Sequence, residues 1–276
     1  MKTILVLTDL STKAENAAIY AFKIATKTNA NIILFHSCES FKPVNVTESG
    51  SWEYEDYEAA KNESFTALAQ LKTYLLTNLE PGAFRPEINF LNDIGLDLGS
   101  CVNQLVKNRN IDLIIMGTKG DDRLSHIFNG SDASDILEHA YCPVLFVPEA
   151  YDLDHLKTIV FANDLKKNYT KETNLLVEFA KIDQSHIIMV HFGEYENNAY
   201  TCLSYIQNTL GYTDVTSWLA PFKNIGNQLR KFETSVKADL TVMIHHHGIH
   251  LERFITGSKS ENMLNHNEVP LLILPG

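Results

Sequence analysis

The sequence predicts an α/β protein made of two tandem copies of one domain, each with a parallel sheet and helices on both faces. Two observations lead to this prediction. Short apolar runs alternate with helical patterns along the chain, which is typical of β–α–β units. The order of these segments then restarts near residue 157, in a chain of 276 residues that is long enough for two domains.

The elements of the first copy follow from their apolar spacing. The apolar run at 3–8 is typical of a strand buried in a parallel sheet. Thr12-Lys-Ala-Glu15 has the pattern of a capping box, and small apolar residues follow it at helical spacing. The same rules predict strands at 31–37, 86–91, 112–116 and 143–147 and helices at 54–79, 96–107 and 132–140.

The second copy repeats the first at two offsets. The segment from Lys2 to Leu10 matches Lys157 to Leu165, at an offset of 155 residues (164 − 9). Further on, Gly130-Ser131 matches Gly257-Ser258, at an offset of 127 (257 − 130). The difference of 28 residues (155 − 127) predicts a shorter loop and helix after the second strand of the copy. We therefore expect domains at 1–150 and 151–276.

Composition excludes several classes of protein. A net charge of −11 without a basic stripe argues against nucleic acid as a main partner. The apolar start is cut short by Asp9, so it is a strand and not a signal peptide, and no run approaches the roughly 18 apolar residues of a membrane span. We expect a cytoplasmic protein without a membrane partner. The four cysteines form no CxxC pair and are expected to be structural thiols; Cys38 is the one near the proposed site.

Three separate stretches carry the candidate ligand site. In an open parallel sheet, ligands bind beyond the carboxyl ends of the strands, where the strand order reverses. Asp9, Ser37 and Gly117 each follow or end a predicted strand. Asp9 could accept a hydrogen bond from a ribose hydroxyl, and the Ser37 backbone could hydrogen-bond to the edge of a nucleotide base. A glycine loop with Ser131 could hold the phosphates.

Each of these residues also has a purely structural alternative. An aspartate between a strand and a helix often caps its own turn. Ser131 could be an ordinary helix N-cap, and glycines in such a loop often serve the turn alone. Their joint placement favours the ligand site.

The spacing of these glycines resembles a family signature. Gly117-x-x-Gly120, nine residues and then Gly130-Ser131 is similar to the G-2x-G-9x-G-S/T pattern of nucleotide-binding, UspA-like universal stress proteins. The resemblance includes the strand end at 8–11, the strand at 33–36 and the terminal strand at 142–148, and it covers the chain as a tandem pair.

The resemblance implies two tandem Rossmann-like domains of the adenine nucleotide alpha hydrolase type, each with five strands in the order 3-2-1-4-5. It implies ATP as the usual ligand, and pairing of the two domains through their fifth strands, Pro143–Pro148 and Pro270–Pro275, with a homodimer also open. Carried over by position, the nucleotide-binding residues are Asp9, Ser37, Met116, Gly117, Gly120, Gly130, Ser131 and Asp132.

Two departures from the pattern matter. Asp132 would repel a triphosphate unless Lys119, Arg123 or a metal such as Mg²⁺ offsets its charge. In the second copy, Ile244 and His247 replace Gly117 and Gly120, and side chains there should block the close backbone approach that a phosphate needs. We expect the second domain to keep Asp164 but not to bind ATP in the same way.

Histidines occupy the corresponding space in the second copy. His245, His246, His247 and His250 could bind zinc or another transition metal. The alternative is a polar loop with solvated or hydrogen-bonded histidines. We favour the polar loop, because zinc sites usually show stricter spacing.

These observations lead to a nucleotide-binding stress-response regulator or nucleotide sensor with an unidentified protein partner. The alternatives are a ligand-free interaction module and a slow ATP hydrolase. The chain has no P-loop, no Gly-x-Ser-x-Gly elbow and no His-Glu-x-x-His helix, so no catalytic residues are assigned and at most a weak ATPase is expected.

Overall fold

The computed structural model describes residues 1–38, 52–94, 98–118, 136–137, 141–149, 151, 155–163, 170–192, 196–220, 225–245 and 269–275. The first half of the chain contains β1 (Thr3–Leu7), α1 (Thr12–Thr28), β2 (Asn31–Cys38), α2 (Trp52–Thr77), β3 (Ile88–Ile94), α3 (Leu98–Arg109), β4 (Leu113–Thr118) and β5 (Val144–Pro148). The second half contains β6 (Thr158–Asn163), α6 (Thr170–Asp183), β7 (His186–Phe192), α7 (Glu196–Ser204), the π-helix η1 (Tyr205–Thr209), β8 (Val215–Ala220), α8 (Ile225–Val236), β9 (Leu240–His245) and β10 (Leu271–Pro275).

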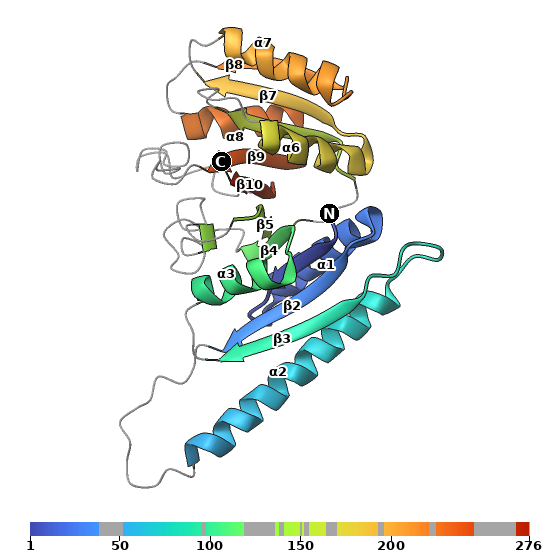
Figure 1. Cartoon of the computed structure of the whole chain (residues 1–276), viewed down its shortest axis with the longest axis vertical. Helices are drawn as coiled ribbons and strands as arrows, with labels where there is room; N and C mark the ends of the chain where they lie inside the picture. Colours follow the sequence, from blue (N-terminus) through green and yellow to red (C-terminus); the bar gives the residue numbers. More distant parts are fainter. Residues whose placement is uncertain are drawn as a thin grey trace.

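One sheet of ten strands runs through the whole molecule (Figure 1), in the order β3-β2-β1-β4-β5-β10-β9-β6-β7-β8. Each half therefore has the predicted order 3-2-1-4-5, and all strand pairs within a half are parallel. The halves meet where β5 and β10 pair antiparallel, with Phe146 opposite Leu271. The predicted fold class and the predicted pairing of the fifth strands are both confirmed.

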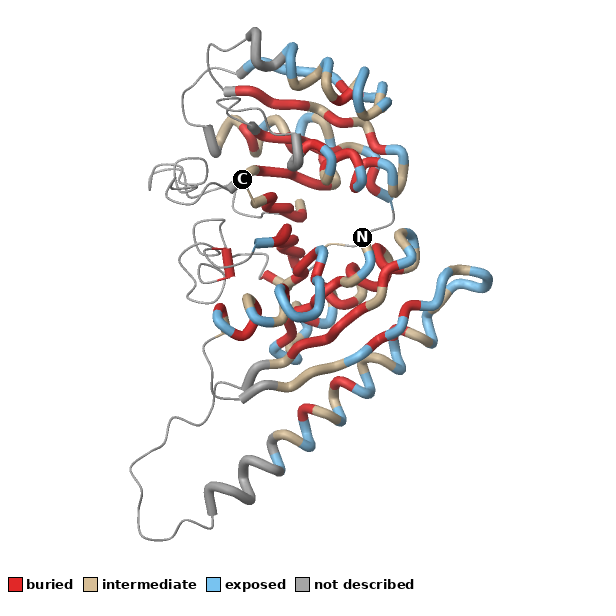
Figure 2. Tube along the Cα trace, in the orientation of Figure 1, coloured by how far each residue is buried: buried red, intermediate tan, exposed pale blue. Residues whose placement is uncertain are grey.

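Helices cover both faces of this sheet, because alternate strand residues point to opposite sides. Ile4 and Val6 belong to the core beneath α1, α2 and α6, whereas Leu5 and Leu7 belong to the core beneath α3 and α8. Buried residues concentrate in the strands and on the inner sides of these helices (Figure 2). The strands are apolar on both faces, as expected for a covered parallel sheet.

The repeat extends to details of the backbone. Helix α1 is followed by Asn29 in the left-handed conformation, and α6 by Gln184, at the offset of 155. Asp112 and Asp239 are equivalent at the offset of 127. The Asp112 carboxylate accepts hydrogen bonds from the backbone N–H groups at the start of β1, and the Asp239 carboxylate accepts those at the start of β6. The second half is 28 residues shorter between its second and third strands. There α7 and η1, between β7 and β8, take the place of the longer α2 between β2 and β3.

Several side chains connect the two halves through hydrogen bonds and an ion pair. Asn16 on α1 donates to the carbonyls of Pro148 and Tyr151, at 3.0 and 2.9 Å, where the chain leaves β5. The Tyr151 hydroxyl then donates to the Asp239 carbonyl in the second half, at 2.9 Å. At the other end of α1, Lys27 Nζ lies 2.8 Å from both carboxylate oxygens of Asp183 on α6. Helix α1 therefore contacts the second half at two levels.

The second half carries a buried polar pair that the first half lacks. Thr241 Oγ1 on β9 donates to Glu233 Oε1 on α8 at 2.5 Å, and both residues are buried. The equivalent residues of the first half, 127 positions earlier, are Val106 and Ile114, which are buried and apolar. Burial raises the pKa of the Glu233 carboxyl, more than the Thr241 hydrogen bond and the Arg230 charge lower it.

Some local predictions need correction. The capping box at Thr12 is wrong: α1 begins at Thr12, Ser11 is the N-cap residue, and its side chain makes no cap hydrogen bond. The reason is that the Ser11 carbonyl accepts the first helical hydrogen bond, from the Glu15 N–H at 2.9 Å, so Ala14 and not Glu15 stands three residues after the cap. Strand β4 is also longer than predicted and includes Gly117 and Thr118. Of the helix predicted at 132–140, only residues 136 and 137 are described, and both are helical and buried.

Candidate functional site

Three predicted site residues lie at one end of the first half's sheet. Leu7 of β1 is in register with Phe35 of β2 on one side and with Met116 of β4 on the other. Asp9 and Ser37 each follow these residues by two positions, and Gly117 follows Met116 directly. Between β1 and β4 the strand order reverses, which is where open α/β sheets bind ligands.

A tight turn after β1 places Asp9. The Asp9 Oδ1 atom accepts the Ser11 backbone N–H at 3.0 Å and also the Ser11 hydroxyl. Leu10 between them has a φ of 61°, which is uncommon for a non-glycine residue, and its N–H donates to Thr8 Oγ1 at 3.0 Å. The structural alternative for Asp9, that it caps its own turn, is therefore realised.

The Asp9 carboxylate is nevertheless open to solvent, with a side chain that is 55% exposed. Its second oxygen, Oδ2, lies 3.3 Å from Lys13 Nζ, one turn into α1. Burial acts to raise the pKa of Asp9, but the Ser11 hydrogen bonds and the Lys13 charge outweigh it, so the pKa is lowered. Asp9 is therefore an ionised acceptor with lone pairs still facing solvent.

Gly117 lies directly beneath the first turn of α1. A Cβ atom at this position would lie 2.4 Å from the Lys13 carbonyl oxygen and 2.7 Å from its carbon, distances that real Cβ atoms essentially never show. Glycine is therefore required here by the packing of α1 on β4, whatever the ligand. The same contact brings the helix start and Asp9 close to the end of β4.

The remaining described site residues flank this contact. Met116 is partly buried and packs against the core beneath α3. His36 Nδ1 on β2 donates to the Thr8 carbonyl at 2.7 Å, which ties the end of β2 to the turn after β1. The Ser37 backbone lies in β2, in register with Asp93 of β3.

The rest of the predicted site lies outside the described residues. This applies to Gly120, Gly130, Ser131 and Asp132 of the nucleotide motif and to His246, His247 and His250 of the histidine cluster. His245 is the last residue of β9. Within the described ranges, no three His, Cys, Asp or Glu side chains come close enough to hold a metal ion. The metal site stays an untested prediction.

The register of the second half identifies the counterpart of Gly117. Gly117 is opposite Val147 in the first half, and Ile244 is opposite Leu274 in the second, at the same offset of 127. Ile244 packs its side chain against the core. The second half thus places a bulky apolar residue where the first has glycine.

Three of the described cysteines form no disulfide and are partly or fully buried: Cys101, Cys142 and Cys202. Burial raises the pKa of the Cys142 thiol to about 12, with a contribution from Asp112, and that of Cys202 to about 11. Neither is a thiolate at neutral pH, which agrees with structural roles.

The sequence analysis did not identify Lys13. Its backbone carbonyl packs against Gly117, and its side chain forms an ion pair with Asp9. Its spacing of four residues from Asp9 at a helix start was an available signal.

Comparison with known proteins agrees with this geometry. The model of the universal stress protein family matches residues 1–148, more than half of the chain. The chain belongs to the universal stress protein family. A universal stress protein of Methanocaldococcus jannaschii is 30% identical over 146 residues, which is 53% of this chain and 81% of that protein.

Solved structures extend the likeness to both halves of this universal stress protein. The crystal structure of a universal stress protein from Archaeoglobus fulgidus superposes with a TM-score of 0.70, covering 99% of this chain and 98% of that one at 15% identity. A protein of unknown function from Pseudomonas aeruginosa gives a TM-score of 0.57, covering 100% and 92% at 15% identity. At such identities these matches establish the tandem fold alone.

No helix in the described part of the chain has the length and apolar character needed to cross a membrane.

Proposed function

We propose that the first half binds an adenine nucleotide, ATP being the first candidate, at the carboxyl ends of β1, β2 and β4. One observation carries the proposal. Where the strand order reverses, the first turn of α1 lies on Gly117 and its Lys13 reaches Asp9, so that residues from distant stretches meet at one end of the sheet.

The chemistry of these groups suits a nucleoside. Asp9 is an ionised, solvent-facing acceptor able to take a hydrogen bond from a ribose hydroxyl. The glycine-spaced stretch that continues from β4, with Gly120, Gly130 and Ser131, would hold the phosphates through backbone N–H groups. Asp132 would then need Lys119, Arg123 or Mg²⁺ nearby, and Mg-ATP is the form to test.

The second half is proposed as a structural or regulatory half. Ile244 fills the position of Gly117, which argues against a second nucleotide bound in the same manner. The chain would act in the cytoplasm as a stress-response regulator or nucleotide sensor, with a protein partner that reads its state.

A ligand-free interaction module is the second candidate, because Asp9 already serves its own turn and Gly117 is required by packing. A slow ATP hydrolase, with Asp132 holding Mg²⁺, is the third.

The test is to purify the full chain, release any bound small molecule by denaturation and identify it by mass spectrometry. Thermal unfolding with and without excess Mg-ATP accompanies it. Co-purified adenine nucleotide, or a rise in melting temperature with Mg-ATP, supports the proposal. Absence of both would favour the interaction module, and phosphate release that is lost in Asp132→Asn would favour the hydrolase.

A further inference from the structure

Lys13 connects the two strand ends at which the proposed nucleotide site lies. Its backbone carbonyl packs against Gly117 near the end of β4, where a Cβ atom would lie 2.4 Å from the carbonyl oxygen. Its ammonium group lies 3.3 Å from Asp9 Oδ2, in the turn after β1. Strands β1 and β4 are neighbours in the sheet. The side chain of Lys13 therefore extends from the glycine-bearing strand end to the carboxylate.

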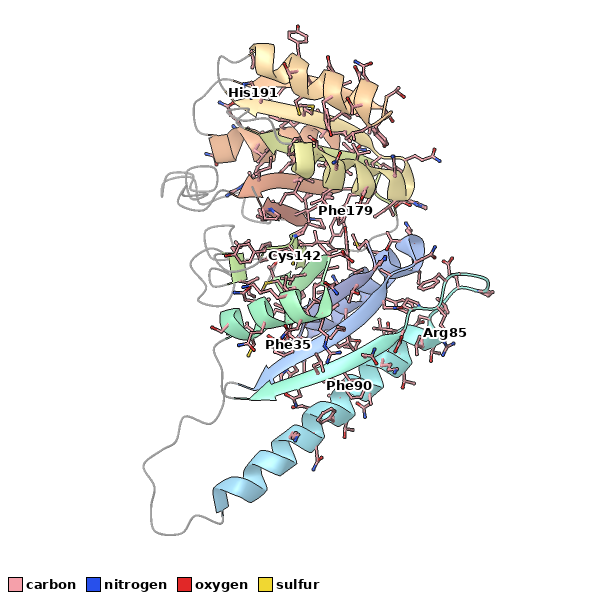
Figure 3. The ribbon with its side chains drawn as sticks, viewed as in Figure 1. Phe35, Arg85, Phe90, Cys142, Phe179 and His191 are labelled. Atoms are coloured by element: carbon pink, nitrogen blue, oxygen red, sulfur yellow. The ribbon has the colours of Figure 1, made fainter. Side chains whose placement is uncertain are left out.

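This lysine is held at both of its ends. The turn that carries Asp9 is anchored to β2, because Thr8 donates its N–H to the carbonyl of Phe35 at 2.9 Å. Phe35 itself is buried in the core beneath α3 (Figure 3). The Asp9 carboxylate accepts the Ser11 N–H at 3.0 Å, and at the other end the contact with Gly117 fixes the lysine backbone. The positive charge is therefore preorganised beside the carboxylate.

The ammonium group has capacity for a further acceptor. It carries three N–H donors, and the contact with Asp9 Oδ2 takes one of them. The lysine side chain is 27% exposed, so its aliphatic part is largely covered while the charged end stays accessible. A ligand that binds the Asp9 carboxylate therefore comes within reach of a fixed positive charge.

We propose that Lys13 binds the phosphate next to the ribose and so makes this site selective for adenine nucleotides over adenosine. The inference rests on the proposed function, in which Asp9 accepts a ribose hydroxyl and the phosphates lie against the glycine stretch that continues from β4. A ligand held in this way extends from Asp9 toward Gly117, along the lysine side chain. Its first phosphate would then accept a charge-assisted hydrogen bond from the ammonium group.

The overall charge of the chain makes such a local cation important. The net charge is −11, which disfavours the approach of an anionic ligand. Lys13 places one positive charge where the ligand would bind, and it stands in the first turn of α1, at the positive end of the helix dipole. Because salt screens a partly exposed charge, we expect the contribution of this lysine to nucleotide affinity to decrease as ionic strength rises.

The second half supports this assignment through its sequence. At the offset of 155, Asp164 corresponds to Asp9 and is retained, whereas Asn168 replaces Lys13. The glycine that contacts the lysine backbone in the first half is also replaced, by Ile244. The half that is proposed not to bind a nucleotide in this manner has thus lost both contacting groups. If the lysine served only to pair with the aspartate, its loss beside a retained aspartate would have no explanation.

The test compares wild type with Lys13→Met by isothermal titration calorimetry against adenosine, AMP and Mg-ATP. We expect the affinity for AMP and for Mg-ATP to fall about tenfold, the lower end of the range for a hydrogen bond to a charged group, because the site is partly exposed. The affinity for adenosine should change less than twofold. Lys13→Arg keeps the charge and should retain most of the preference for AMP over adenosine.

Lys231→Met is the matched control, because it removes one exposed positive charge from the second half and should bind all three ligands as wild type does. Thermal unfolding checks that each variant is folded. Wild-type protein that binds none of the three ligands would overturn the proposed function, and this inference with it. Equal AMP affinity in wild type and Lys13→Met would overturn the inference alone. So would an equal loss of affinity for adenosine and AMP, which would leave Lys13 the role of holding Asp9.

Discussion

At the scale of single residues, Asp9 accepts hydrogen bonds within its own turn and also exposes an ionised carboxylate to solvent. Asp9→Asn keeps an oxygen that can accept from Ser11 but removes the charge and one acceptor. If Asp9 binds the ribose, affinity for Mg-ATP should fall about 10- to 100-fold, the effect of losing a charged hydrogen bond. Isothermal titration calorimetry of both proteins with Mg-ATP measures this change in affinity.

The repeat supplies the control for this variant. Asp164→Asn makes the same change at the equivalent position of the second half and should leave ATP affinity unchanged. Equal affinity in wild type and Asp9→Asn would show that Asp9 serves only the turn.

Gly117 gives a prediction about stability. Because a Cβ atom would lie 2.4 Å from the Lys13 carbonyl oxygen, Gly117→Ala must push α1 away from β4. We expect a loss of about 1–3 kcal/mol in unfolding free energy, the usual cost of overpacking, measured by urea denaturation. An unchanged midpoint would contradict the close contact. Any loss of nucleotide binding in a Gly117 variant therefore has to be separated from this structural effect.

At the scale of elements, the contact between α8 and β9 contains a buried carboxyl. The folded state raises the pKa of Glu233 above its ordinary value of 4.5, so it favours the protonated form. Stability is therefore highest below that ordinary pKa and falls as pH rises from it through the raised value. Glu233→Gln should flatten this dependence while keeping a partner for Thr241. Unfolding free energy measured against pH tests this, and an unchanged slope would contradict it.

The first half suggests a stronger version of that experiment. The double variant Glu233→Val with Thr241→Ile copies Val106 and Ile114 into the second half. Replacing buried polar or ionic groups by well-packed apolar residues often stabilises a protein by roughly 1–4 kcal/mol, and we expect a gain in that range. Either single variant should do less well, since Glu233→Val alone leaves the Thr241 hydroxyl buried without its acceptor.

At the scale of the whole molecule, the ion pair between Lys27 and Asp183 joins α1 to α6 with little exposure of the carboxylate, 11%. Lys27→Met should lower the unfolding free energy by about 1–2 kcal/mol, because the largely buried Asp183 carboxylate loses its cation and retains the hydrogen bond from the Leu156 N–H. Lys231→Met removes an exposed cation of α8 and serves as the control. Equal losses in both variants would assign the effect to net charge.

The sequence was sufficient for most of the fold, for physical reasons. Strands buried on both faces are continuous apolar runs, and the repeat allowed each element of the first half to predict its counterpart, down to the shortened segment between β7 and β8. The helix start was mispredicted by one residue because Ser11 and Thr12 are both residue types that favour the N-cap, and the choice depends on the turn from Asp9 to Ser11, which the sequence pattern does not reveal.

The site was predictable only in part. The strand ends that carry Asp9, Ser37 and Gly117 follow from the topology, and all three lie at one end of the sheet. The contact of Gly117 with the Lys13 backbone could not be predicted, because it depends on how closely α1 lies on β4. The ion pair between Lys27 and Asp183 could not be predicted either, since neither residue belongs to a sequence motif.

The β5–β10 junction has a consequence for how this protein responds to dilution and to mutation. Because both strands belong to one polypeptide, their encounter is unimolecular, with an effective concentration set by the short connection from Pro148 to Thr158. The pairing therefore does not depend on expression level, as it would between separate subunits. Covalent linkage also removes the twofold constraint, so a change in one half is not copied into the other. Ile244 opposite Leu274, beside an unaltered Gly117 opposite Val147, is a difference that two identical subunits could not have maintained.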